Sequence, residues 1–212
     1  MAVAATSFNV TKILRCAKDR HPFQNGMIHA QSVDRLFVIT GGPGAGKSAL
    51  IAELARHGFA TMPEAGRAII QDQVEIGGSA LPWADRSAFA ELMLSWELRS
   101  YRSASEMPGP VIFDRGVPDV AGYLRLCELP VPDHVKRAAE LYRYHRRVFL
   151  APPWPEIFTR DAQRRQTFAE AQATCEAVSE AYLSLGYELI SLPLAPVEER
   201  AAFVAERIQI RG

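Results

Sequence analysis

The chain has 212 residues with 24 basic and 24 acidic side chains, so its formal net charge is zero. A neutral chain has no overall field that attracts nucleic acid or an anionic membrane, and we expect neither as a partner. The three cysteines form no Cys-x-x-Cys pair, which argues against a disulfide framework and a cysteine zinc site. No apolar run reaches the roughly 18–20 residues of a membrane-spanning helix, and we expect a cytoplasmic protein.

Residues 1–32 precede the first strong structural pattern and are predicted to form an N-terminal extension. They contain several basic residues, a single acidic residue (Asp19) and no apolar segment typical of a secretory signal. Two interpretations stay open: a transit peptide, or a loose extension upstream of a true start at Met27. In both cases we expect the folded domain to cover residues 33–212.

From about residue 34 onward, short apolar runs alternate with longer amphipathic segments. The runs predicted to be strands are Leu36–Thr40, Phe59–Met62, Val111–Phe113, Val148–Leu150 and Tyr187–Leu192. The segments predicted to be helices are Lys47–Arg56, Ala65–Ile76, Arg86–Ser105, Pro118–Leu126, Asp133–Tyr144, Phe168–Leu185 and Val197–Gln209. Continuous apolar strands between helices are typical of a parallel sheet covered on both faces. The pattern therefore predicts one three-layer α/β domain.

A glycine-rich turn lies between the first predicted strand and the first predicted helix. Its sequence is G-x-x-x-x-G-K-S, from Gly41 to Ser48. Glycines let main-chain N–H groups approach phosphates, and the helix N-terminus adds partial positive charge. Lys47 would reach the β- and γ-phosphates, and the Ser48 hydroxyl would coordinate Mg²⁺. The predicted nucleotide-binding residues are Gly41, Gly42, Pro43, Gly44, Ala45, Gly46, Lys47, Ser48 and Ala49. This turn is a P-loop, and since no Asn-Lys-x-Asp guanine motif occurs, we expect ATP rather than GTP.

Charged residues follow the second and third predicted strands. Because ligands bind at the carboxyl ends of parallel strands, we expect these residues to face the P-loop. Asp114 is predicted to bind Mg²⁺ with Ser48, and Arg115 to bind an acceptor substrate. Glu64 is predicted to be the base that accepts the acceptor's proton, although capping of the following helix would also explain it. Arg67 either binds substrate or pairs with Glu64 or Asp114.

A second charged cluster follows the fourth predicted strand and contains Arg160, Asp161, Arg164 and Arg165. Arginines on a mobile segment can close over phosphates and stabilise transition-state charge. We therefore predict a lid here, with Arg164 and Arg165 as its catalytic residues. A solvated helix face is the alternative, because charge runs commonly have that role.

Four segments in this order, FVITGGPGAGKS, MPEAGR, VIFDRG and VFLAPPWPEIFTRDAQRR, resemble the AAA_28-type P-loop ATPase domain over roughly residues 34–210. That group includes a ribosylnicotinamide-kinase domain and a eukaryotic GTP- and lipid-binding trafficking protein. The resemblance implies a five-stranded parallel sheet of order 2-3-1-4-5 with a helical lid, as in small-molecule kinases. It also implies that Glu64 matches the base of deoxynucleoside kinases, that Asp114 and Arg115 match their acidic-arginine pair, and that Pro193 to Pro196 flank the nucleotide base.

Three functions are compatible with these residues. The first is a kinase that transfers the γ-phosphoryl group of Mg-ATP to a nucleoside- or nucleotide-like acceptor. The second is a regulatory NTPase with water as the acceptor, and the third is a protein- or lipid-binding module that uses nucleotide as a switch. The helical segment from Ala80 to Ser105 favours the first, because such kinases recognise their acceptor there. Both a monomer and a homodimer are compatible with the sequence.

Overall fold

The computed structural model describes residues 34–158 and 167–209. The predicted N-terminal extension lies outside these residues. The predicted lid residues Arg160, Asp161, Arg164 and Arg165 lie outside them as well, so the lid stays a prediction.

Five parallel strands form one sheet in the order β2-β3-β1-β4-β5. The strands are β1 (Leu36–Gly41), β2 (Ala60–Met62), β3 (Val111–Asp114), β4 (Arg147–Ala151) and β5 (Glu188–Ser191). The central strand β1 pairs with β3 through Ile39 opposite Asp114, and with β4 through Gly41 opposite Ala151. The ends of these three strands therefore lie together, and the predicted strand order is confirmed.

Helices follow each strand, and all but the last of them connect successive strands. They are α3 (Lys47–Arg56), α4 (Ala65–Glu75), α5 (Arg86–Glu106), α6 (Val117–Leu126), α7 (Asp133–Leu141), α8 (Phe168–Ser184) and α9 (Val197–Gln209). A short 3₁₀ turn, Pro155–Ile157, follows β4 and was not predicted. Within residues 34–158 and 167–209, no helix combines the length and apolarity needed to cross a membrane.

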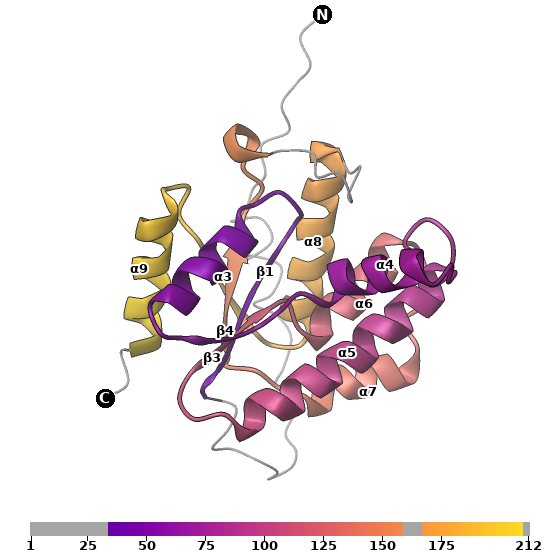
Figure 1. Ribbon diagram of the computed structural model, residues 1–212, viewed down its shortest axis with the longest axis horizontal. Coiled ribbons are helices and arrows are strands. Elements are labelled where there is room, and N and C mark those ends of the chain that lie inside the picture. Colours follow the sequence, from indigo (N-terminus) through magenta and orange to yellow (C-terminus); the bar gives the residue numbers. More distant parts are fainter. Residues whose placement is uncertain (1–33, 159–166, 210–212) are drawn as a thin grey trace, which may run out of the picture.

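The sheet lies between two helical layers, each with its own hydrophobic core (Figure 1). Along β1, Leu36 and Val38 belong to the core formed with α5, α6, α7 and α8. The alternate residues Phe37 and Ile39 belong to the core formed with α3 and α9. Successive side chains of a strand point to opposite faces, so a strand buried on both faces is apolar throughout. This explains why the sequence of β1 reads as one continuous apolar run.

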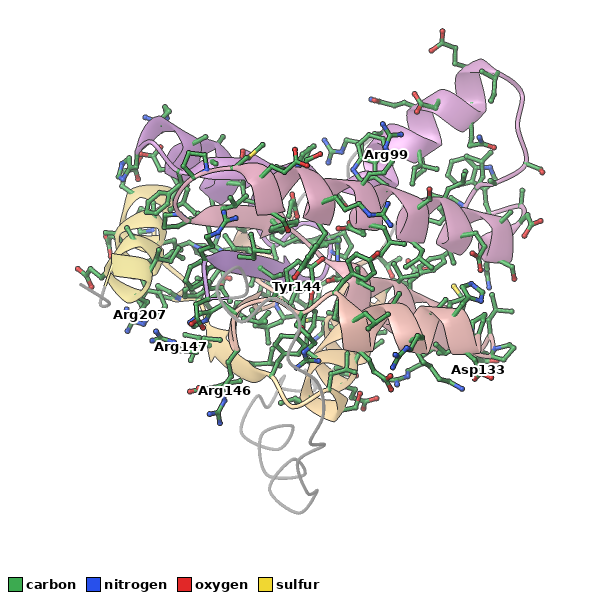
Figure 2. The ribbon with its side chains drawn as sticks, turned by 90° about the horizontal axis from the view of Figure 1, so that it is seen from below. Arg99, Asp133, Tyr144, Arg146, Arg147 and Arg207 are labelled. Atoms are coloured by element: carbon green, nitrogen blue, oxygen red, sulfur yellow. The ribbon has the colours of Figure 1, made fainter. Side chains whose placement is uncertain are left out.

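The predicted boundaries agree with the structure to within one residue, except at the end of α7. The prediction extended this helix to Tyr144, but it ends at Leu141. Tyr144 leaves the helix to enter the core, where it is 1 % exposed and its hydroxyl accepts a hydrogen bond from the Val117 N–H at 3.2 Å. Figure 2 shows Tyr144 in the middle of the molecule and Arg146 and Arg147 at its edge. Tertiary packing of one aromatic ring thus ends the helix early.

Helices α6 and α8 pack closely at Gly122. A Cβ atom at this position would lie 2.9 Å from the Val178 Cα, so only a residue without a side chain permits this approach. The close packing brings Tyr182 of α8 against the first turn of α6, where its hydroxyl bonds Asp119. The fold therefore places the N-terminus of α6, the end of β3 and the end of β1 in one region.

Candidate functional site

The P-loop leaves β1 at Gly41 and enters α3 at Lys47. Gly41 has a φ of 134°, and a Cβ there would lie 2.2 Å from the Ala151 carbonyl oxygen. Gly46 precedes the helix with a left-handed φ of 72°. The Lys47 side chain turns back inside the loop, where its Nζ donates to the carbonyls of Gly42 at 2.6 Å and Gly41 at 3.2 Å. The ammonium group therefore lies within the glycine-rich turn, against its backbone carbonyls.

Residues from distant segments brace this loop. Arg200 of α9 is 3 % exposed, and its Nη2 donates to the Ala45 carbonyl at 3.1 Å. The Phe158 ring lies so close to Gly44 that a Cβ there would approach it to 2.5 Å. Sequence reasoning missed both contacts, because each joins residues that are more than a hundred positions apart in the chain. They hold the loop in one conformation from the side of α9 and from the segment after β4.

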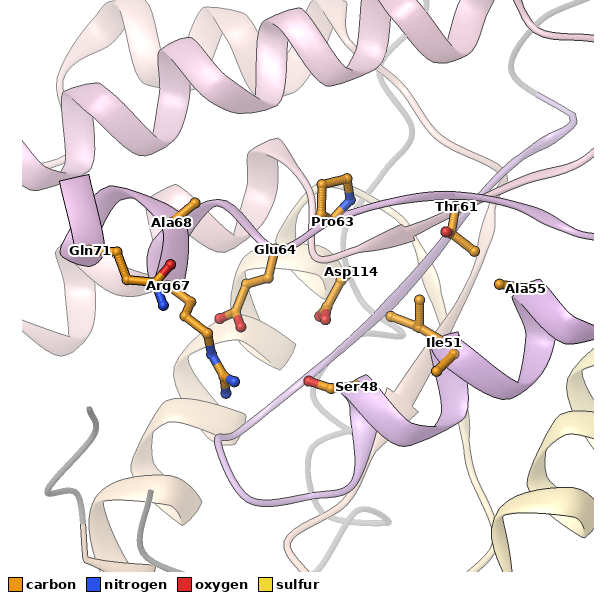
Figure 3. A pocket seen from close by; sticks show the side chains of 11 residues that line it. Ser48, Ile51, Ala55, Thr61, Pro63, Glu64, Arg67, Ala68, Gln71 and Asp114 are labelled. Carbon is orange, nitrogen blue, oxygen red and sulfur yellow. The ribbon is translucent and has the colours of Figure 1, made fainter. Parts of the chain in front are cut away.

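A cavity of about 360 Å³ opens beside the P-loop. Figure 3 shows the Ser48 hydroxyl, the Asp114 carboxylate and the Glu64 carboxylate directed toward its centre from α3, β3 and the start of α4. Arg67 extends toward the same space from α4. The cavity is lined by Ser48, Ile51, Ala52, Ala55, Thr61, Pro63, Glu64, Arg67, Ala68, Gln71 and Asp114. The structure therefore gathers four predicted site residues that lie up to 66 positions apart, from Ser48 to Asp114.

Glu64 and Arg115 form an ion pair at the N-terminus of α4. The Arg115 Nε donates to Glu64 Oε1 at 3.2 Å, and the two side chains are only 14 % and 11 % exposed. Glu64 occupies the position before the first turn of α4, yet its side chain makes no hydrogen bond to the described backbone of that turn. Glu64 therefore does not cap α4 through a hydrogen bond, and its carboxylate is directed at Arg115, while the favourable placement of its charge at the start of the helix stays an alternative.

Asp119 is the main residue of this region that sequence reasoning missed. Its carboxylate is bonded by Arg115 Nη1 at 3.1 Å, the Gly116 N–H at 3.0 Å, the Tyr182 hydroxyl at 2.7 Å and the Thr40 hydroxyl at 2.6 Å. Its spacing from Gly116, three residues, is that of a capping-box carboxylate, which was the one signal available. Arg115 is also close in sequence, four residues before Asp119, whereas the Thr40 and Tyr182 hydroxyls are 79 and 63 positions away.

Glu97 of α5 is a second missed carboxyl group, only 3 % exposed. Burial raises its pKa well above the usual range for glutamate, and the negative charges of Asp119, Asp114 and Glu64 add to this effect. The positive charge of Arg115 opposes it but is a smaller contribution. Glu97 therefore keeps its proton to a higher pH in the folded protein than in the unfolded chain.

This difference in pKa between the folded and unfolded states predicts that the free energy of unfolding of Glu97→Gln rises relative to that of the wild type as the pH increases. Below the unfolded pKa both states hold the proton, and burial of Glu97 carries no ionisation penalty. As the pH rises toward the folded pKa, the unfolded chain loses its proton first, and the wild type loses stability that the neutral glutamine retains. Urea unfolding without nucleotide at pH 4.5 and pH 7.5 checks this. A wild-type to variant difference that does not change with pH would contradict the assignment.

Two groups in the cavity suit a magnesium ion. The Ser48 hydroxyl and the Asp114 carboxylate are hard oxygen ligands that line the same space. No cluster of three or more acidic, histidine or cysteine side chains with metal-binding geometry occurs among the described residues. Mg²⁺ is commonly held by one or two protein oxygens together with substrate phosphates and water.

The sheet order and the loop at its centre define the class of this protein as a P-loop protein with a kinase-like fold. More specifically, the chain belongs to the AAA_28 family of AAA domains, whose model matches residues 36–200. The resemblance drawn from the sequence motifs is thereby confirmed. Comparison with curated proteins gave no match.

Similar solved structures include the NadR protein in complex with NR, with a TM-score of 0.63 and 15 % sequence identity. The match covers 85 % of this chain but 53 % of the NadR chain, so this protein spans about half of that relative. The deoxyadenosine kinase of M. mycoides, with the products dCMP and dCDP, has a TM-score of 0.59 and 13 % identity over 82 % of this chain and 99 % of that one. At such identities the likeness is one of fold.

Proposed function

We propose that this protein transfers the γ-phosphoryl group of Mg-ATP to a small-molecule acceptor of nucleoside or nucleotide type. The convergence of Ser48, Asp114 and Glu64 in one cavity next to the Lys47 loop carries this proposal. Phosphoryl transfer needs positive charge at the phosphates, a metal site and a group that takes the acceptor's proton, and these residues supply each.

In the proposed reaction the acceptor oxygen forms a bond to the γ-phosphorus while the bond to the β-phosphate oxygen breaks. The proton of the acceptor passes to the Glu64 carboxylate, and the products are ADP and the phosphorylated acceptor. Bound Mg²⁺ would supply charge neutralisation at the phosphates, with Ser48 and Asp114 as its protein ligands. Arg67 and Arg115 would orient the acceptor, and Arg164 and Arg165 would close over the phosphates from the predicted lid.

The names of two similar structures support an acceptor of this class, because they describe a protein with bound NR and a deoxyadenosine kinase. The lining of the cavity is compatible with it. One wall is apolar, formed by Ile51, Ala52 and Ala55, and could pack against a ring, while Gln71 and Arg67 offer hydrogen bonds. A mixed lining of this kind is typical of sites for small polar molecules.

The test is acceptor-dependent formation of ADP by the full chain with Mg²⁺ and ATP. We expect at least one of a panel of nucleosides, nucleoside monophosphates, sugars and vitamins to raise the rate well above that without acceptor. Mass spectrometry should find the phosphorylated acceptor in the same mixture. ADP formation at one rate with and without every acceptor would contradict the kinase proposal, and would favour an NTPase that uses water.

A further inference from the structure

Asp119 collects hydrogen bonds from four donors that lie on three separate parts of the fold. Thr40 is on β1 one residue before the P-loop, Arg115 and Gly116 follow β3, and Tyr182 is on α8. The carboxylate is 7 % exposed and does not line the cavity. Capping of α6 needs only the bond from the Gly116 N–H. The other three bonds therefore require a different explanation.

Arg115 is held between two carboxylates by different edges of its guanidinium group. Its Nη1 donates to Asp119 at 3.1 Å and its Nε to Glu64 at 3.2 Å. A guanidinium is planar with donors in a fixed fork, so two such bonds fix its orientation as well as its position. The backbone of Arg115 adopts a φ of 76°, which is unfavourable for a residue with a side chain. The surroundings therefore hold Arg115 in one particular arrangement.

We propose that Asp119 is a positioning residue for the reaction proposed above. It orients Arg115, and through Arg115 it holds the Glu64 carboxylate at a defined place relative to the P-loop. Thr40 connects Asp119 to that loop, because Thr40 directly precedes Gly41 and its hydroxyl donates a hydrogen bond to the Asp119 carboxylate. Asp119 itself touches no substrate, and its effect passes through the guanidinium.

Asp119→Asn tests this with little change in shape. The two oxygens of Asp119 accept bonds in pairs, Oδ1 from Thr40 and Arg115, and Oδ2 from Gly116 and Tyr182. An amide turns one of the two positions into a donor. The hydroxyls can rotate to accept, but the Arg115 and Gly116 N–H groups cannot, so either orientation places two donors against each other. The variant also loses the charge that attracts the guanidinium.

The first measurement is independent of activity. Exchange of the Arg115 Nε–H proton with water is followed by ¹⁵N NMR, and the signal is assigned through its loss in Arg115→Lys. The Nε–H bonds Glu64, so Asp119→Asn acts on it through the guanidinium: when the Nη1 bond to Asp119 is lost, the group is less restrained, and we expect exchange of the Nε–H to accelerate about tenfold or more. Asp85→Asn is the matched control, because Asp85 also accepts a backbone bond at a helix start, from Ala88 at 2.9 Å, but on an exposed helix end. Unchanged exchange in Asp119→Asn would overturn the proposal.

The second measurement is kinetic, with deoxyadenosine as the probe acceptor and saturating Mg-ATP. We expect kcat to fall about 10- to 100-fold in Asp119→Asn, with the Kd for Mg-ATP within about twofold of the wild type. Equal losses of nucleotide affinity and kcat would indicate a merely structural role and overturn the proposal. If the wild type transfers no phosphoryl group to any acceptor, the proposed function fails, while the exchange measurement still decides whether Asp119 positions Arg115.

A second variant keeps the proposal falsifiable if Asp119→Asn does not fold. Thr40→Val combined with Tyr182→Phe removes two donors that orient the carboxylate and leaves its charge in place. We expect an intermediate acceleration of Arg115 Nε–H exchange in this double variant. Exchange as slow as in the wild type would show that Arg115 does not depend on this network, and the proposal would be wrong.

Discussion

Glu64→Gln is expected to lower the rate of phosphoryl transfer by about 10²- to 10⁴-fold, the range typical for loss of a general base. Glutamine has nearly the same shape and can still accept the Arg115 Nε–H bond, which is 3.2 Å long in the wild type. It cannot accept a proton from the acceptor. The loss should therefore appear in kcat, while Mg-ATP affinity stays within about twofold. Single-turnover transfer and equilibrium titration with ATP measure the two quantities separately.

The appropriate control is Glu91→Gln, because Glu91 is an exposed glutamate that pairs with His134 away from the cavity. Its transfer rate should equal that of the wild type. If Glu64→Gln were as active as Glu91→Gln, Glu64 would not be the base. The ion pair with Arg115 would then have a role in binding or stability alone.

Lys47→Ala is expected to weaken Mg-ATP binding about 10- to 100-fold, as for loss of a hydrogen bond between charged groups. The Lys47 ammonium is 6 % exposed and bonded to the carbonyls of Gly41 and Gly42, so it is already inside the phosphate-binding turn. A bound ligand stabilises a protein according to its concentration relative to its Kd. The rise in melting temperature on addition of Mg-ATP should therefore shrink strongly in the variant.

Lys136→Ala is the control for this second experiment, since Lys136 is exposed on α7 and pairs locally with Asp133 at 2.9 Å. Its ATP-induced shift in melting temperature should match the wild type. An unchanged shift in Lys47→Ala would contradict nucleotide binding at the P-loop. This outcome would remove the kinase and the NTPase interpretations together.

Much of the fold was predictable because its information is local. The continuous apolar run from Leu36, the glycines of the following turn and the helix after it are each encoded within a few residues. The same holds for Glu64 and Asp114. Both lie at or just after the end of a predicted parallel strand, and ligands bind at the carboxyl ends of such strands. These residues meet in the cavity as expected.

The residues that escaped prediction are those whose role depends on distant partners. Arg200 contacts a loop residue 155 positions away, and the Tyr182 hydroxyl reaches Asp119 across 63 positions. No periodicity or motif in one chain reports such pairs. Glu97 was missed for a related reason. A single glutamate in an amphipathic helix is expected to be exposed to solvent, and only the tertiary packing shows that this one is buried.

The division of β1 between two cores has a consequence for how disturbances reach the nucleotide site. Phe37 and Ile39 pack with α3 and α9, whereas Leu36 and Val38 pack with α5 to α8, and all four precede the phosphate-binding turn directly. Loosening of either helical layer would thus shift the same short strand. A substitution far from the cavity, on either side of the sheet, can thereby alter ligand affinity without any contact with the ligand, and affinity becomes a sensitive measure of the integrity of both halves.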